Sequence, residues 1–192
     1  MAVRASQTRP VRYIAFLRAI NVGGHVVKMD ALRAHFEALR LTAVESFIAS
    51  GNVIFLATSA DPAAIEQRIE ARLATQLGYS VATFLRTPAE LAALVAQQPF
   101  GPTDPLDAGH ALSVAFVRTP PSAAATTRLL ALTSPVDDFQ IAGREIFWRC
   151  RVRVSESKVS GARLEKALAA PSTVRNITTI RKLAALYPPL DA

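Results

Sequence analysis

The sequence is poor in the residues that most often carry out catalysis or bind metals. Among 192 residues it has one cysteine, Cys150, and three histidines. A single cysteine excludes an intrachain disulfide and favours a reducing compartment, the cytoplasm. The histidines have no metal-ligand spacing with one another or with acidic residues, so we expect no metal and no cofactor. They are His25, His35 and His110.

Candidate catalytic groups are correspondingly few. Cys150 lies on the apolar side of a predicted strand, which is typical of an inert buried thiol. Asp137 and Asp138 precede a predicted strand and are typical of turn residues rather than of a catalytic carboxylate pair. The sequence therefore assigns no enzymatic reaction.

Long apolar runs are also missing. No run approaches the roughly 20 residues that a membrane-spanning helix needs. The first ten residues carry positive charge but lack the apolar segment of a secretory signal. The 51% hydrophobic and 19% charged content is typical of a globular protein with a substantial core. We expect a soluble cytoplasmic protein without membrane partners, with residues 1–11 as a flexible N-terminus.

Apolar residues recur with periods of two and 3.6 in alternating segments, which predicts strands and helices. Ser50-Gly51-Asn52 is typical of a hairpin turn, and Asp61-Pro62 of a helix start. The order over residues 12–96 is β-α-β-β-α-β, the ferredoxin-like pattern. The predicted strands are 12–18, 44–49, 53–57 and 80–86, and the helices are 29–40, 62–77 and 88–96.

Residues 97–110 contain three prolines, two glycines and two aspartates, which is typical of a connection. The same pattern then begins again in residues 111–192 and ends in a helix that Pro171-Ser172-Thr173 opens. We expect an α+β fold of two ferredoxin-like halves with mainly antiparallel sheets and a C-terminal helix. The later predictions are strands at 111–118, 136–141 and 145–154, and helices at 121–133, 160–169 and about 173–186.

Glycines and polar side chains gather after the first predicted strand and in the 50–52 hairpin. In a ferredoxin-like unit these two places lie at one sheet edge, within about two strand spacings of 4.8 Å. Glycine N–H groups and a guanidinium suit an anion, so we expect a phosphorylated or carboxylated small molecule there. Turns without any ligand explain the same residues. The residues are Arg18, Asn21, Gly23, Gly24, Lys28, Ser50, Gly51 and Asn52.

Three motifs in this order resemble the bacterial domain-of-unknown-function 1697 family. They are Leu17-Arg18-Ala19-Ile20-Asn21-Val22-Gly23-Gly24, Ser50-Gly51-Asn52-Val53 and Thr173-Val174-Arg175-Asn176. The family signatures read L-R-G-I-N-V-G-G, S-G-N-V and T-x-R-N-W-N-T. The resemblance extends from about residue 12 to residue 186 and implies an α+β fold of ferredoxin-like type and no established activity. Ala19 stands where the family favours glycine, so we expect no unusual backbone angle there. Ile177-Thr178 replaces Trp-Asn.

The third motif also belongs to the predicted site. Ser172 or Thr173 is expected to cap the last helix, with Arg175 and Asn176 in its first turn. If this helix start meets the Arg18–Gly24 loop, the two form a composite anion pocket. An ordinary capped helix with a polar outer face is the alternative.

The net charge of +7 is concentrated near the C-terminus, because residues 144–182 hold ten Lys or Arg against three Glu. Within the predicted strand 145–154, one face carries Phe147, Arg149, Arg151 and Arg153. Single-stranded nucleic acid stacks on such faces, so a nucleic-acid-binding module is a second hypothesis. A solvated sheet face explains the same pattern. A protein-interaction domain, with a second copy as one partner, is the third hypothesis.

Overall fold

The computed structural model describes residues 9–21, 24–106 and 108–189. The chain divides into a first unit, Met1–Pro88, and a second unit, Ala89–Ala192. In the described residues no helix is both long and apolar enough to cross a membrane.

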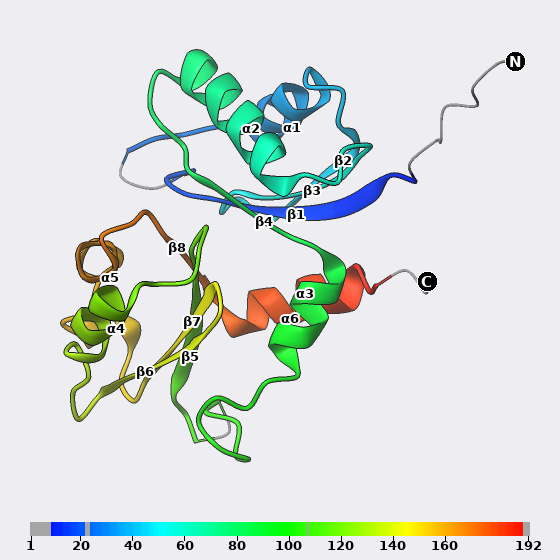
Figure 1. The fold of residues 1–192 in the computed structure, drawn as a ribbon. Coiled ribbons are helices and arrows are strands. Elements are labelled where there is room, and N and C mark those ends of the chain that lie inside the picture. The colour runs from blue at the N-terminus through cyan, green and yellow to red at the C-terminus, as the bar shows by residue number, and fades with distance from the viewer. Residues whose placement is uncertain (1–8, 22–23, 107, 190–192) are drawn as a thin grey trace, which may run out of the picture. The chain divides into compact units, whose positions relative to one another are not determined.

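The first unit is a four-stranded antiparallel sheet with two helices on one face (Figure 1). The strand order is β2-β3-β1-β4, which is the ferredoxin-like order. Every neighbouring pair is antiparallel. The elements are β1 (Val11–Leu17), α1 (Met29–Glu37), β2 (Thr42–Phe47), β3 (Asn52–Ala57), α2 (Pro62–Leu77) and β4 (Thr83–Arg86).

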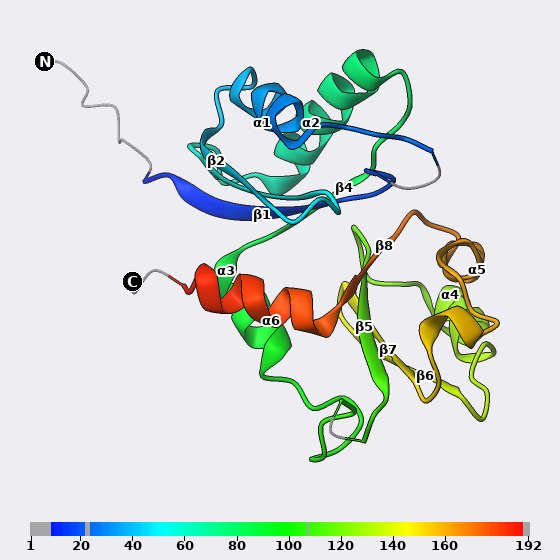
Figure 2. The same ribbon diagram turned by 180° about the vertical axis from the view of Figure 1, so that it is seen from behind.

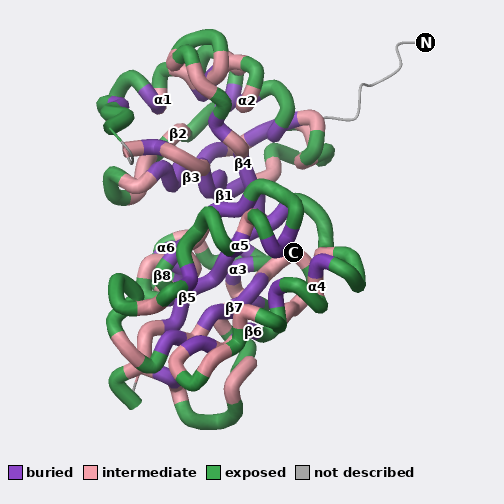
Figure 3. The backbone as a smooth tube through the Cα atoms, turned by 90° about the vertical axis from the view of Figure 1, so that its left-hand side faces the viewer, coloured by how far each residue is buried: buried purple, intermediate pink, exposed green. Residues whose placement is uncertain are grey.

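The core of the first unit lies between its helices and its sheet. Tyr13, Ala15 and Leu17 alternate along β1 and face the helices, where they join Phe36 of α1 and Ile69 of α2 in one apolar cluster. The helix α2 starts where its sequence predicts, because the Asp61 side chain accepts hydrogen bonds from Ala63 N and Ala64 N. The central strands are buried along their length (Figure 3).

The second unit repeats the arrangement with the order β6-β7-β5-β8. The helices α4 and α5 lie on one side of this sheet and α6 lies on the other (Figures 1 and 2). The α+β class with two ferredoxin-like halves is thereby confirmed. The elements are α3 (Pro88–Val95), β5 (Ala111–Phe116), α4 (Ala123–Leu130), β6 (Asp137–Ala142), β7 (Glu145–Cys150), the 3-10 turn η1 (Val154–Glu156), α5 (Gly161–Leu168), β8 (Thr173–Asn176) and α6 (Ile177–Leu186).

The strand β8 replaces the helix start predicted at residue 173. Thr173–Asn176 pairs antiparallel with Ser113–Phe116, so this segment satisfies its backbone in the sheet. The helix begins four residues later, where the Asn176 side chain accepts a hydrogen bond from Thr178 N at 2.8 Å. The prediction was wrong because Pro171-Ser172-Thr173 suits a helix start, whereas the partner strand favours the extended form.

The two sheets also repeat in sequence at corresponding positions. Ile14-Ala15-Phe16-Leu17-Arg18 and Val114-Ala115-Phe116-Val117-Arg118 occupy the end of the first strand in each unit. Leu17 N donates to Gly51 O at 2.8 Å, and Val117 N donates to Arg144 O at 3.1 Å. Each acceptor lies in the hairpin between the second and third strands. The internal duplication therefore extends to individual hydrogen bonds.

Two glutamates of α2 accept hydrogen bonds from backbone N–H groups at the outer edge of β4. Leu85 N and Thr83 N of β4 donate to Glu66 and Glu70 of α2, each at 2.8 Å. In the second unit, Ser172 N, just before β8, donates to Glu165 of α5 at 2.9 Å. These carboxylates occupy backbone donors that an edge strand would otherwise offer to another chain.

Candidate functional site

The predicted loop begins at the end of β1, beside the β2–β3 hairpin. Leu17 N bonds to Gly51 O and Arg18 N bonds to Ala82 O, each at 2.8 Å. These two bonds fix the start of the loop between the hairpin and the residue that precedes β4. The structure thus brings the start of the loop and Asn21 to the β2–β3 hairpin in the first unit. Gly23 lies outside the described residues.

The side chain of Asn21 holds the loop together. Its Nδ2 donates to Ala49 O at 2.9 Å and to Val27 O at 3.2 Å, while its Oδ1 accepts from Val27 N at 2.6 Å. One amide therefore ties both ends of the loop to the hairpin. Because its donors are used within the protein, Asn21 positions the loop rather than contacting a ligand.

Gly51 and Asn52 also stabilise the structure of the hairpin. Gly51 has φ +73°, and a Cβ there would lie 2.9 Å from Ile20 Cβ. Only glycine satisfies both the backbone angle and the close approach. Asn52 is fully buried, and its Nδ2 donates to Phe47 O at 3.1 Å and to Ser50 Oγ at 2.9 Å. Both residues shape the surface on which the loop lies.

The loop backbone contains two non-glycine residues in the left-handed region. Ala19 has φ 62° and Asn21 has φ 55°. The expectation of an ordinary angle at residue 19 was therefore wrong, because the bonds of Arg18 N and of the Asn21 side chain hold the chain on both sides of Ala19. For alanine this conformation costs roughly 1–2 kcal/mol. Such strain persists where surrounding contacts enforce it, often at functional sites.

The outer part of the loop presents backbone donors and cations. Gly24, His25 and Val26 are exposed, and their N–H groups have no hydrogen-bond partner in the described part of the chain. Lys28 is exposed at the N-cap of α1. The His25 ring stacks on Tyr79 with centroids 3.8 Å apart, which anchors this stretch. Residues 18–28 include no acidic side chain.

The other three predicted residues lie in the second unit. Arg175 belongs to β8, not to a helix, and is 8% exposed. It donates to Thr173 Oγ1 at 2.8 Å and to Val174 O at 2.9 Å. Burial lowers the Arg175 pKa to about 10, which leaves the guanidinium charged at neutral pH. Asn176 caps α6.

The arginine strand does not form an exposed stacking face. β7 ends at Cys150, and Phe147 is 1% exposed. Asp138 Oδ2 accepts from Arg149 at 2.5 Å and lies 2.6 Å from a guanidinium nitrogen of Arg151. Arg153 is exposed and lies 3.9 Å from Glu156. The aromatic ring of the proposed platform is therefore unavailable for stacking.

Acids outside residues 144–182 neutralise much of the basic region. Arg144 pairs with Glu90 and Arg181 pairs with Asp104, each at 2.5 Å. Asp138, which the sequence suggested as a turn residue, lies in β6 and pairs with both Arg149 and Arg151. Its buried neighbour Asp137 accepts from Trp148 Nε1 at 2.8 Å and from Ser157 Oγ at 2.9 Å. Counting charges along the chain could not reveal these long-range pairs.

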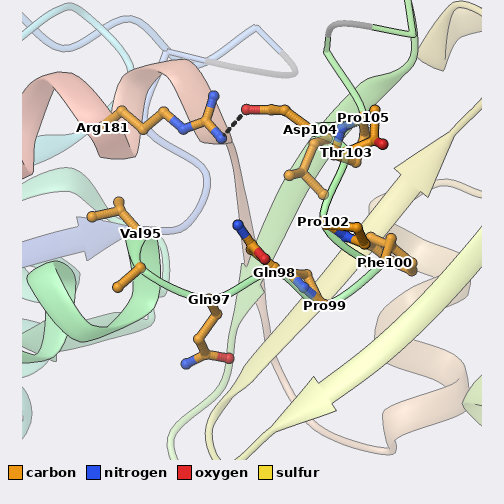
Figure 4. Close-up of a pocket in the computed structure, with 13 residues that line it drawn as sticks. Val95, Gln97, Gln98, Pro99, Phe100, Pro102, Thr103, Asp104, Pro105 and Arg181 are labelled. Atoms are coloured by element: carbon orange, nitrogen blue, oxygen red, sulfur yellow. Dashed lines mark hydrogen bonds and ion pairs between the residues drawn. The ribbon is translucent and has the colours of Figure 1, made fainter.

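A pocket of about 310 Å³ lies where α6 approaches the connection that follows α3 (Figure 4). Sequence reasoning identified this connection by its prolines but assigned it no role. Arg181 and Asp104 pair at the rim (Figure 4). The residues that line it are Val95, Ala96, Gln97, Gln98, Pro99, Phe100, Gly101, Pro102, Thr103, Asp104, Pro105, Leu112 and Arg181.

The described residues include no cluster suited to a metal ion, and the Cys150 thiol is buried. No group of three or more His, Cys, Asp or Glu side chains in the described ranges could hold a metal ion. Cys150 is 1% exposed, and burial raises its thiol pKa. A buried thiol with a raised pKa is a poor nucleophile.

A known protein has the same fold. A solved structure, that of the conserved bacterial protein SP0830 from Streptococcus pneumoniae, superposes with a TM-score of 0.70. It is 24% identical in sequence, and the match covers 93% of this chain and 99% of that one. This likeness shows the fold. No curated protein matches the chain. Residues 11–147 match the family described as protein of unknown function DUF1697, and the chain belongs to that family.

Proposed function

We propose that the protein binds a small anionic molecule, phosphorylated or carboxylated, at the loop that follows β1. The ligand would lie against residues 24–28, with Arg18 and Lys28 supplying charge. The turn between β2 and β3, residues 48–51, would support the loop on the side away from the ligand. The observation that carries this proposal is the row of exposed residues Gly24, His25 and Val26, whose backbone N–H groups have no hydrogen-bond partner among the described residues.

The chemistry of the loop favours anions over cations. Successive backbone N–H groups in a turn form a concave anion site, and neighbouring cations strengthen it. The loop 18–28 contains two basic residues, one histidine and no acidic residue. An ammonium or metal ion would find no carboxylate there.

The bonds of the Asn21 side chain support the same conclusion. They tie residue 21 to Val27 and to Ala49, and Ala19 has a left-handed conformation. Backbone that such bonds hold before a ligand arrives loses less conformational entropy when the ligand binds. The bonds to Val27 therefore help to position the backbone donors next to it.

Equilibrium titration with inorganic phosphate and with citrate tests the proposal. Arg18→Gln and Lys28→Gln should each weaken binding about tenfold, since each removes a charge-assisted contact. Arg40→Gln removes the same charge beyond the far end of α1, about 13 Å of helix away, and should leave the affinity unchanged. Equal weakening by all three variants would show a general charge effect instead.

A second candidate function uses the surface of α5. Lys158, Arg163 and Lys166 are exposed and have no ion-pair partner in the described residues. We propose this cationic surface, rather than the β7 face, as a nucleic-acid contact. Replacing all three by glutamine should then reduce RNA affinity and flatten its salt dependence. Unchanged affinity would exclude this surface.

A further inference from the structure

The pocket beside α6 is lined by two opposite charges and by apolar residues. Arg181 and Asp104 approach its rim from α6 and from the connection after α3 (Figure 4). Val95, Phe100 and Leu112 are among the apolar residues that line it. Its volume of about 310 Å³ is at the lower end of the roughly 300–1,000 Å³ range of small-molecule sites. The pocket therefore suits a ligand smaller than a nucleotide.

The two charged groups keep bonding capacity for a ligand. Arg181 uses one nitrogen, Nη2, for Asp104 Oδ2 at 2.5 Å. Its remaining N–H groups have no partner in the described part of the chain. A guanidinium has five N–H donors, so most of them remain available for a carboxylate.

Asp104 is held as an oriented carboxylate. Its Oδ1 accepts from Leu106 N at 3.0 Å. The bond from Leu106 N, together with Arg181, lowers the Asp104 pKa against the opposing effect of burial. The carboxylate is therefore ionised at neutral pH, and its two oxygens have further lone pairs to accept an ammonium group.

Phe100, one of the apolar lining residues, is held by an arginine that does not line the pocket. The Arg149 guanidinium lies 4.5 Å from the centroid of the Phe100 ring. Asp138 in turn holds Arg149 through hydrogen bonds of 2.9 and 2.5 Å. These contacts orient Phe100 before any ligand arrives. Figure 4 also shows the Gln98 side chain directed toward the Arg181–Asp104 pair, while Gln97 is directed away from it.

We propose that this pocket binds a free α-amino acid with an aliphatic or aromatic side chain. The ligand carboxylate would bind the remaining donors of Arg181, and its ammonium group would bind Asp104. The side chain would lie against Val95, Phe100 and Leu112. A zwitterion can bind both members of the Arg181–Asp104 pair, whereas an anion or a cation can bind only one of them.

Calorimetric titration of the full chain with L-leucine and L-phenylalanine tests this proposal. We expect saturable binding of at least one of them. 4-Methylpentanoate, which lacks the ammonium group, and isoamylamine, which lacks the carboxylate, should bind at least about tenfold more weakly than leucine. These comparisons use the unaltered protein and do not depend on the folding of any variant.

Variants then locate the site. Arg181→Gln and Asp104→Asn should each weaken amino-acid binding about tenfold, while Lys182→Gln next to Arg181 and Arg18→Gln in the first unit should not change it. Retained binding in Arg18→Gln separates this pocket from the anion loop. Absence of amino-acid binding to the unaltered protein would overturn the proposal. Equal binding of leucine and 4-methylpentanoate would also overturn it.

Discussion

The Nδ2 group of Asn21 donates a hydrogen bond to Ala49 O across 2.9 Å and thereby joins two loops that are 28 residues apart in the chain. The same side chain bonds to both backbone groups of Val27. One amide thus fixes Val27, in the segment that the proposed anion site uses, to the end of the β2–β3 hairpin. An asparagine that looks like a ligand-binding residue in the sequence is, in the structure, the support of that site.

Asn21→Gly should destabilise the protein by about 1–3 kcal/mol, because the bonds of the amide are lost and Val27 N is left unpaired. Glycine tolerates the left-handed conformation at residue 21, so this variant isolates the hydrogen bonds. Urea denaturation gives the change in free energy of unfolding. A change below about 0.5 kcal/mol would contradict a structural role for this side chain.

Ala19→Gly should raise stability by about 1 kcal/mol, since it relieves the left-handed strain at φ 62°. Ala169→Gly is the matched comparison, because Ala169 ends α5 with φ 53°. We expect Ala169→Gly to raise stability by the same amount. Thermal unfolding of both variants measures the two effects. Destabilisation by Ala19→Gly would mean that the alanine side chain contributes more than the strain costs.

Gly51→Ala and Gly24→Ala form a second matched pair. Both glycines have positive φ, but a Cβ at Gly51 would meet Ile20 at 2.9 Å, and one at Gly24 would meet nothing within 4 Å. We expect Gly24→Ala to cost about 1 kcal/mol from backbone strain alone. Gly51→Ala should cost about 1–3 kcal/mol more, from overpacking. Chemical denaturation compares them, and equal costs would rule out the close approach as the cause.

The Asp138 pair predicts a loss of stability in acid. Burial opposes ionisation of Asp138, but the hydrogen bonds and charges of Arg149 and Arg151 outweigh it and lower the Asp138 pKa. The pKa of Asp138 is therefore lower in the folded than in the unfolded protein, so ionised Asp138 stabilises the fold. This stabilisation is complete above the unfolded-state pKa of about 4 and is lost as the pH falls through the folded-state pKa. Asp138→Asn should therefore be less stable than the unaltered protein at pH 7, and the difference should shrink toward pH 2. A pH-independent difference in urea denaturation would argue against this linkage.

The sequence predicted the fold where local and long-range signals agree. The Asp61-Pro62 helix start and the alternating strands of the first unit indicate the same elements that the structure contains. The prediction failed at Thr173–Asn176, where local residues favour a helix start and pairing with β5 favours a strand. That pairing joins segments far apart in the chain, and no local pattern encodes it.

The candidate site was predictable in position but not in the roles of its residues. Strand order alone places the end of β1 beside the 50–52 hairpin. Whether Asn21 and Asn52 face a ligand or the protein depends on which carbonyl groups lie within reach, and folding decides that. The Arg181–Asp104 pair spans 77 residues, which explains why its pocket escaped sequence reasoning.

The central claim is that residues 24–28 bind an anion, and an NMR titration of ¹⁵N-labelled protein with inorganic phosphate at constant ionic strength tests it most directly. Saturable shifts should concentrate on the amides of Gly24, His25, Val26 and Lys28 and should be lost in Arg18→Gln but kept in Arg40→Gln. Shifts confined to α5, or shifts that grow linearly without saturation, would contradict an anion site in this loop.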